Sequence, residues 1–226
     1  MQRHPLMGID EGKAKRGDDV SRETLERVRA HVSRETWARL EAYVALLERW
    51  SGAINLVSVA DRKRIWTHVA DSLQLLPLLA SYPPPLLDIG SGAGFPGVVL
   101  AIGLGWPVTL AERDKRKAAF LREVAHALAL PLDIHAAPVE TLARPCHHVV
   151  TARAVAPLSR LIEWSRPNLA PDGVAVFFKK EDDLKELDRL SLPPSVRLCL
   201  QPNRVRPGGR ILLISGLAAG QAERAP

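Results

Sequence analysis

The segment from Asp88 to Gly97, Asp-Ile-Gly-Ser-Gly-Ala-Gly-Phe-Pro-Gly, combines a carboxylate with a glycine-rich turn that could hold a ligand. It follows two leucines and leads into the apolar residues 98–102, so the pattern predicts a strand, a tight turn and a helix start. Pro96 suits the first helical turn, whose free N–H groups would face a ligand. Three glycines permit positive φ and a close approach of the ligand to the backbone: Gly90, Gly92 and Gly94.

Two ligands fit this turn. In one frame, Gly92, Gly94 and Gly97 form the G-x-G-x-x-G pattern of a dinucleotide site, with Glu112 at the spacing of the ribose-binding acid. The first glycine of that frame comes too late for a turn that begins where the strand ends. The frame also places the carboxylate of Asp88 beside a negatively charged pyrophosphate, which is unfavourable. A tight turn that binds nothing is the third interpretation.

The other frame, Asp-x-Gly-x-Gly-x-Gly beginning at Asp88, resembles the turn of class I methyltransferases that use S-adenosyl-L-methionine. We favour it because it uses both Asp88 and Gly90. The resemblance implies that Asp88 serves the cationic methionine end of the cofactor. It also implies that Glu112, which ends the next predicted strand, accepts hydrogen bonds from the ribose hydroxyls. A plain ion pair of Glu112 with Lys115 or Arg116 is the alternative.

The composition is that of a globular chain with a basic surplus. The chain has 226 residues, 46% of them hydrophobic, and a net charge of +6; its pI is about 9.7. This length accommodates one α/β domain with a small helical addition, and the charge suits a polyanionic partner. No apolar run reaches membrane-spanning length, and no signal peptide is evident. Two cysteines are too few for a disulfide framework or a zinc site, so we expect a cytoplasmic protein.

The N-terminal part of the chain predicts helices without strands. Residues 1–19 lack apolar periodicity and are expected to be a disordered tail. Residues 20–82 are expected to form a helical cap, and residues 83–226 a methyltransferase domain. Helical periodicity in the cap predicts helices at 21–31, 34–50 and 65–79.

From Leu86 onward, predicted strands and helices alternate. The alternation predicts an α/β fold with a mostly parallel, Rossmann-like sheet of seven strands and a ligand at their carboxyl ends. The last two strands have no helix between them and predict an antiparallel hairpin. With the helical cap, this is the outline of a class I methyltransferase. Strands are expected at 86–89, 107–111, 132–136, 147–152, 173–179, 195–200 and 210–215, and helices at 96–103, 115–129, 157–168 and 181–190.

Two further segments could contact such a cofactor or its substrate. Val139-Glu140, after the third predicted strand, lies where adenine would bind: a backbone N–H and a carboxylate could recognise its edge, with Phe95 and Val139 as apolar walls. Glu140 is equally compatible with an ordinary surface position. His68, Asp71 and Ser72 share one face of a predicted helix at i, i+3 and i+4. One helix cannot present a catalytic Ser–His–Asp triad, so we expect a polar cluster that docks the cap and lines the substrate cleft.

The segment after the fourth predicted strand, Thr151-Ala-Arg-Ala-Val-Ala-Pro157, bears on the reaction type. It contains neither the Asn/Asp-Pro-Pro-aromatic motif of exocyclic-amine methylation nor a cysteine nucleophile for pyrimidine C5. Cys146, at the start of that strand, is expected to be buried. The sequence Cys146-His147-His148 predicts no metal site, because adjacent residues of a strand point to opposite faces.

Arg153 is the informative residue of this segment. Its guanidinium could bind the cofactor carboxylate, a phosphate or a purine edge. Lys179, at the end of the fifth predicted strand, adds a second positive group, and no active-site base is evident. That arrangement suits guanine N7, which carries no proton, so that alignment and desolvation would suffice for transfer.

Together these residues resemble the RsmG (GidB) family of bacterial 16S rRNA 7-methylguanosine methyltransferases, over about residues 36–215. The resemblance implies methyl transfer from S-adenosyl-L-methionine to N7 of guanine 527 in the 530 loop of 16S rRNA. It also implies cofactor binding at the matching positions Gly90, Phe95, Val139, Glu140 and Arg153. The other matching motifs are Arg49-Trp-Ser-Gly-Ala-Ile-Asn-Leu56, His68-x-x-Asp71-Ser72, Arg116-Lys117 before Phe120-Leu121, and Phe178-Lys179.

The sequence departs from the family pattern at two positions. Glu112 stands where an aspartate is common, and Lys180 stands where a glycine usually follows the lysine. The implied partner is 16S rRNA within the 30S subunit, and we expect a monomer without membrane contact. Two other functions stay open: an RNA-binding or ribosome-assembly factor that holds the cofactor without turnover, and an NAD-dependent oxidoreductase.

Overall fold

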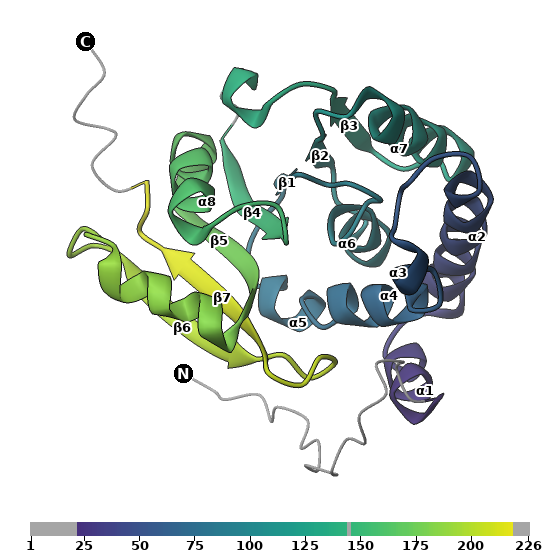
Figure 1. The fold of residues 1–226 in the computed structure, drawn as a ribbon, viewed down its shortest axis with the longest axis horizontal. Coiled ribbons are helices and arrows are strands. Elements are labelled where there is room, and N and C mark those ends of the chain that lie inside the picture. The colour runs from purple at the N-terminus through teal and green to yellow at the C-terminus, as the bar shows by residue number, and fades with distance from the viewer. Residues whose placement is uncertain (1–21, 144–145, 219–226) are drawn as a thin grey trace.

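A seven-stranded sheet forms the centre of the computed structural model, which describes residues 22–143 and 146–218 (Figure 1). The strand order is β3-β2-β1-β4-β5-β7-β6. The first five strands are parallel, and β7 is antiparallel to both β5 and β6, as predicted. The strands are β1 (Leu86–Ile89), β2 (Val108–Ala111), β3 (Leu132–His135), β4 (His147–Arg153), β5 (Leu169–Lys180), β6 (Arg197–Pro202) and β7 (Gly209–Ser215).

Helices cover both faces of the sheet. Those before and between the first three strands lie on one face, and α8 lies on the other (Figure 1). The α-helices are α1 (Arg22–Ala30), α2 (Arg34–Ser51), α3 (Val59–Arg62), α4 (Ile65–Leu73), α5 (Leu76–Leu79), α6 (Gly97–Leu104), α7 (Lys115–Ala127) and α8 (Leu158–Ser165). The 3₁₀ segments are η1 (Val139–Thr141), η2 (Arg166–Asn168) and η3 (Glu181–Arg189).

Alternating residues of the parallel strands fill two separate cores. Leu86 and Val149 belong to the buried cluster beneath α2, α4, α6 and α7, whereas their neighbours Leu87 and Val150 belong to the cluster beneath α8. Successive side chains of a strand point to opposite faces, so a strand covered on both sides must be apolar throughout. All four residues of β1 are buried, and the aspartate among them, Asp88, is therefore exceptional.

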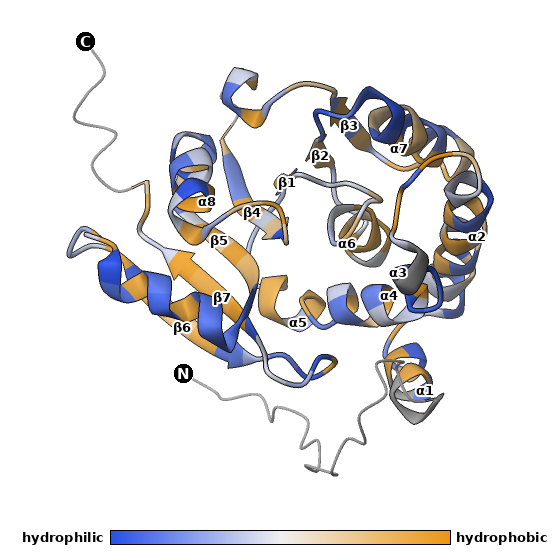
Figure 2. Cartoon of the chain, viewed as in Figure 1, coloured by the Kyte–Doolittle hydropathy of each residue, from blue (hydrophilic) through white to orange (hydrophobic). Residues whose placement is uncertain are grey.

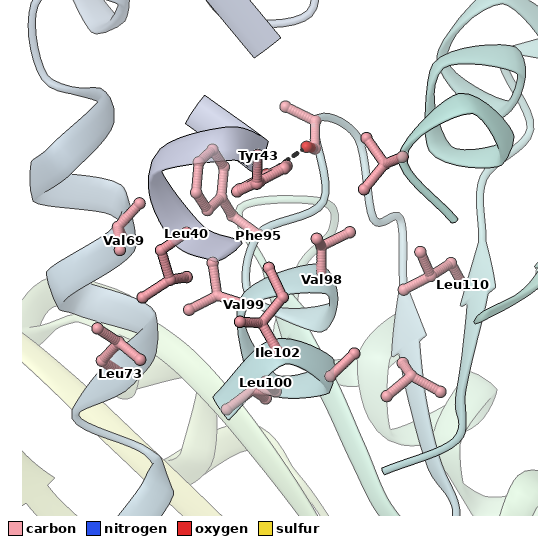
Figure 3. Close-up of a cluster of buried hydrophobic side chains, with 14 of the residues drawn as sticks. Leu40, Tyr43, Val69, Leu73, Phe95, Val98, Val99, Leu100, Ile102 and Leu110 are labelled. Atoms are coloured by element: carbon pink, nitrogen blue, oxygen red, sulfur yellow. Dashed lines mark hydrogen bonds between the residues drawn. The ribbon is translucent and has the colours of Figure 1, made fainter. Parts of the chain in front are cut away.

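Helix α6 is enclosed by the sheet on one side and by α2 and α4 on the other (Figure 3). Its residues from Gly97 to Ile102 are all buried, which explains why this helix is apolar around its whole circumference. Leu40 and Tyr43 of α2 are fully buried against it, while the outward face of α2 is hydrophilic (Figure 2). The helices that precede the sheet thus share one core with it.

Several predicted boundaries are wrong for identifiable reasons. The expected helix 65–79 is interrupted between α4 and α5, because Pro77 lacks an N–H and its ring collides with a continuing helix. The segment 181–190 is a 3₁₀ helix, η3, and the expected helix 157–168 ends as the 3₁₀ turn η2. Cys146 is exposed because it precedes the first paired residue of β4, His147.

Two statements about domain organisation stay predictions. The expected tail, residues 1–19, lies outside the described residues. The division into a cap at 20–82 and a methyltransferase domain at 83–226 also stays a prediction. No helix in the described part of the chain is both long and apolar enough to cross a membrane.

The packing of α2 on α6 should contribute strongly to stability. Replacing Leu40, which is 0% exposed, by alanine should lower the free energy of unfolding by about 2–5 kcal/mol, because a cavity is left against α6. The control Leu200→Ala removes a side chain that is 47% exposed and should cost less than about 1 kcal/mol. Urea unfolding followed by circular dichroism measures both. Equal losses in the two variants would contradict this account of the core.

Candidate functional site

The carboxyl ends of β1, β2 and β4 bring the predicted ligand-binding residues to one edge of the sheet. Ile89 is in register with Ala111 of β2 and with Ala152 of β4. The residues next to these positions in the chain therefore lie near a common region, as the fold type requires. Those residues are Asp88, the glycine turn, Glu112 and Arg153.

The three glycines of the turn adopt the predicted positive φ angles. These are +68° at Gly90, +57° at Gly92 and +101° at Gly94. A Cβ at Gly94 would lie 2.6 Å from Cγ2 of Val98, and one at Gly90 would collide with Val155. At Gly92 it would meet nothing nearer than the Gly90 carbonyl oxygen, at 3.8 Å. Two of the glycines thus serve the packing of the turn, and Gly92 presents a bare backbone where a ligand could approach.

Asp88 holds the turn to the sheet. Its carboxyl group is 1% exposed; it accepts a hydrogen bond from the Thr151 hydroxyl (2.8 Å) and one from the Gly97 N–H (3.2 Å). The first N–H of α6 is therefore directed at Asp88 and not at a ligand, contrary to the prediction from the sequence. Burial raises the pKa of Asp88 to about 6, and the bond from Thr151 is the largest opposing influence.

Glu112 is bound to the same turn. Its two carboxylate oxygens accept hydrogen bonds from the N–H groups of Gly92 and Asp114, each at 2.8 Å. Among the described residues, neither Lys115 nor Arg116 forms an ion pair with it, which removes the plain alternative for this position. A carboxylate can accept about four hydrogen bonds, so Glu112 keeps capacity for two ligand hydroxyls.

The turn is also fixed from the helical side by a residue that the sequence analysis did not select. Tyr43 of α2 donates a hydrogen bond of 2.6 Å to the Ala93 carbonyl oxygen (Figure 3). Burial raises the pKa of this phenol, so it stays a donor. Tyr43 lies in the predicted helix 34–50, but its hydroxyl partner lies fifty positions away in sequence, beyond the reach of a local pattern.

Phe95 packs against Arg153 and against residues of the preceding helices, and its role with Val139 as a wall of an adenine site stays a prediction. The Phe95 ring is 5% exposed: Tyr43 meets it edge-on, His68 stacks on it, and the Arg153 guanidinium lies 5.1 Å from its centre. Val139 belongs to the other buried cluster. Glu140, next to it, accepts a hydrogen bond of 2.7 Å from the Trp164 indole of α8. Phe95 therefore supports Arg153 in this structure.

Arg153 has partners from helix α4. Its Nη1 donates to Nδ1 of His68 at 2.8 Å and to Oδ2 of Asp71 at 3.3 Å. Ser72 lies on the same helix, but its hydroxyl donates to the His68 carbonyl oxygen and does not join the cluster. Lys179 lies at the end of β5, where its ammonium donates to the Ala156 carbonyl oxygen at 3.3 Å.

His68 is neutral in this environment. Burial, followed by the charges of Arg153 and Arg206, lowers its pKa to about 3. Because arginine can only donate, Nδ1 of His68 is the acceptor and the ring proton lies on Nε2, which faces Asp61 at 3.4 Å. An imidazole with so low a pKa is a poor general base near neutral pH.

The loop between β6 and β7 contributes residues that the sequence analysis missed. Nε of Arg206 lies 3.0 Å from Oδ2 of Asp71, and the Asn203 amide donates to Oδ1 of Asp71 at 2.6 Å. The signal available in the sequence was a turn with several arginines, Asn203-Arg-Val-Arg-Pro-Gly-Gly209, between two predicted strands. The arginines of that turn are equally compatible with an ordinary charged surface, so the sequence alone does not single them out as site residues.

A parallel sheet with one reversed strand, a glycine turn after β1 and an acid after β2 define a class I methyltransferase fold. The solved structures agree. The ribosomal protein L11 methylase from Lactobacillus delbrueckii subsp. bulgaricus matches with a TM-score of 0.55 and 15% identity, over 67% of this chain and 79% of that chain. MtNAS, solved in complex with MTA and tNA, matches with a TM-score of 0.54 and 14% identity, over 80% of this chain and 74% of that chain.

Sequence comparison identifies the family. The family model of rRNA small subunit methyltransferase G (GidB) matches residues 36–198. The ribosomal RNA small subunit methyltransferase G of Gluconobacter oxydans is 44% identical, over 81% of this chain and 95% of its own length. That of Rhodospirillum centenum is 46% identical, over 83% and 87%. The chain belongs to the rRNA small subunit methyltransferase G family, in agreement with the resemblance seen in the sequence.

Gly92 offers a direct test of where the predicted cofactor, S-adenosyl-L-methionine, approaches the turn. Gly92→Ala should weaken cofactor binding at least tenfold, because the new methyl group would occupy the bare backbone face, while the left-handed φ costs stability by about 1 kcal/mol. Gly105→Ala is the matched control, since its φ is +68° and nothing lies within 4 Å of the added Cβ. Calorimetric titration with the cofactor measures the affinities. Unchanged affinity in Gly92→Ala would place the cofactor elsewhere.

The depressed pKa of His68 should make stability depend on pH. The unfolded chain binds a proton at this residue below its usual pKa of 6.5, whereas the folded chain does so only below about 3. The stabilising contribution of the neutral His68 is therefore fully present above pH 6.5. It is lost as the pH falls towards 3, by at most about 1.4 kcal/mol per pH unit. The advantage of the wild type over His68→Gln should shrink over that window, as measured by urea unfolding at a series of pH values.

Asp88 provides a control of opposite sign. Its folded pKa of about 6 lies above the ordinary aspartate value of 3.8, so its contribution is present at low pH and is lost as the pH rises through that interval. The difference between the wild type and Asp88→Asn should therefore change in the other direction. Parallel pH curves for the wild type and His68→Gln would contradict the assignment of a neutral, buried His68.

Proposed function

We propose that this protein transfers a methyl group from S-adenosyl-L-methionine to N7 of a guanine in the 530 loop of 16S rRNA, guanine 527 in rRNA numbering. Membership of the rRNA small subunit methyltransferase G family supports small-subunit rRNA as the substrate. The observation that supports N7 is the composition of the site after β4. There the Asp71 carboxylate is paired with Arg153, His68 stays neutral with a pKa too low for a general base, and N7 is a nucleophile that has no proton to remove.

The described residues fit the cofactor. S-adenosyl-L-methionine supplies an electrophilic methyl group on a positively charged sulfur. Gly92 offers an unobstructed backbone face, and Glu112 fixes Gly92 while keeping lone pairs for the ribose hydroxyls. In this proposal Asp88 provides negative charge near the methionine end, and Val139 and Glu140 contact adenine. Arg153 binds the methionine carboxylate through its guanidinium fork.

The chemistry then depends on alignment and exclusion of water. Arg153 is held by Asp71, His68 and the Phe95 ring, so its donors are oriented before substrate arrives. Lys179 lies on the same rim and would contact the rRNA backbone. We further propose that the protein acts as a cytoplasmic monomer on the 30S subunit; its net charge of +6 favours association with RNA.

The test is methylation of small subunits that lack the modification. Purified protein, 30S particles from a strain without this activity and methyl-labelled S-adenosyl-L-methionine should yield 7-methylguanosine at position 527, located by nuclease digestion and mass spectrometry. Arg153→Gln should lower the rate at least about 100-fold, because an oriented charged donor is lost. Arg122→Gln, on the exposed side of α7, is the matched control and should retain the wild-type rate.

Other outcomes would contradict the proposal in distinguishable ways. Label at another nucleotide would overturn the N7 assignment at 527 but keep rRNA methylation. Tight binding of both cofactor and 30S particles without any label in the RNA would instead indicate an assembly factor that does not turn over. Binding of NAD in place of S-adenosyl-L-methionine would overturn the class of reaction.

A further inference from the structure

The loop between β6 and β7 is locked onto helix α4. The side-chain oxygen of Asn203 accepts a hydrogen bond from the backbone N–H of Arg206 at 2.8 Å, and the Asn203 side-chain amide donates to Asp71 at 2.6 Å. Gln74 of α4 donates to the same Asn203 oxygen at 3.0 Å. These bonds fix the loop backbone and therefore the direction in which the Arg206 side chain extends from it.

Arg206 and Arg153 converge on the same two acceptors. Oδ2 of Asp71 lies 3.0 Å from Nε of Arg206 and 3.3 Å from Nη1 of Arg153. Nδ1 of His68 lies 2.8 Å from Nη2 of Arg206 and 2.8 Å from Nη1 of Arg153. Two cations are thus held against one carboxylate and one neutral ring. The next acid, Asp61, faces the opposite nitrogen of His68.

The two guanidinium groups occupy different depths. The side chain of Arg153 is 14% exposed and lies over Phe95, next to the glycine turn. The side chain of Arg206 is 40% exposed and forms the outer member of the pair. A guanidinium has five N–H donors. In the described part of the chain, Nη1 of Arg206 has no hydrogen-bond acceptor, so an arriving oxyanion would gain a charged donor that is already oriented.

We propose that Arg206 binds a backbone phosphate of the acceptor RNA and so sets the register of the target nucleotide in the site. This inference rests on the proposed function and adds a specificity-determining residue to it. The cofactor carboxylate is an oxyanion of the same kind, but the inner position of Arg153 lies nearer the glycine turn, whereas Arg206 faces solvent. Phosphate contacts position a protein on nucleic acid, and a rigid arginine does so with a smaller entropic cost. Asp71 and Asn203 are then positioning residues for Arg206.

Arg206→Gln tests this assignment against the matched control Arg197→Gln. Arg197 lies at the other end of the hairpin, on exposed β6, where its guanidinium donates to the Pro194 carbonyl oxygen. The KM for 30S particles and the equilibrium Kd for a 16S rRNA fragment containing the 530 loop should both rise about tenfold or more in Arg206→Gln, and stay within about twofold in Arg197→Gln. The slope of log K against log salt should fall by about 0.7–0.9, as expected for one lost phosphate contact. The Kd for S-adenosyl-L-methionine should stay unchanged.

Each other result overturns the assignment. An unchanged RNA Kd excludes a phosphate contact, and a weakened cofactor Kd with normal RNA binding assigns Arg206 to the cofactor carboxylate. If Arg206→Gln does not fold, Arg206→Lys replaces it as the test, because lysine keeps the charge but lacks the two-pronged guanidinium. The KM for 30S particles should then rise while the salt slope is retained. Wild-type behaviour of Arg206→Lys would overturn the proposal. Because RNA binding is measured without turnover, an inactive wild type would contradict the proposed function alone.

Discussion

The carboxylate of Asp71 joins three parts of the chain that are far apart in sequence. It comes from α4, and it meets Arg153 from β4 together with Asn203 and Arg206 from the loop before β7. It is 1% exposed, and a buried charge is tolerated only when partners surround it. The same carboxylate therefore attaches helix α4 to the sheet, orders the hairpin loop and orients the arginine at the centre of the site.

The glycine turn is held by a second set of contacts that involve different elements. Tyr43 fixes the Ala93 carbonyl from α2, Glu112 fixes the Gly92 N–H from the end of β2, and Asp88 joins the first N–H of α6 to β1. A loop held from three sides has little conformational freedom left to lose when a ligand binds. The turn is thus prepared for binding, and Phe95 connects it to Arg153.

The strands and most helices could be predicted from the sequence, because each depends on a local pattern. Apolar runs ending at Asp88 and Glu112 located β1 and β2, and alternation with helices predicted the sheet. What could not be predicted are contacts between distant segments: the bond from Arg153 to Asp71 spans 82 positions, and that from Asn203 to Asp71 spans 132. The prediction that Cys146 is buried was wrong for a related reason, because burial at a strand end depends on which residue of the strand is the first to pair.

The enclosure of α6 has a consequence for the order in which the chain can fold during synthesis. The residues of α2 that cover α6 are made well before α6 itself, and the strands that complete its surroundings follow later still. Chains emerge from the ribosome at about 5–20 residues per second, so the apolar face of α2 waits several seconds for its partner. During that interval Leu40, Tyr43 and Leu47 form an unprotected surface of the kind that chaperones recognise. The nascent chain therefore leaves the ribosome with the apolar face of α2 still exposed, and this face is covered only after α6 has been synthesised.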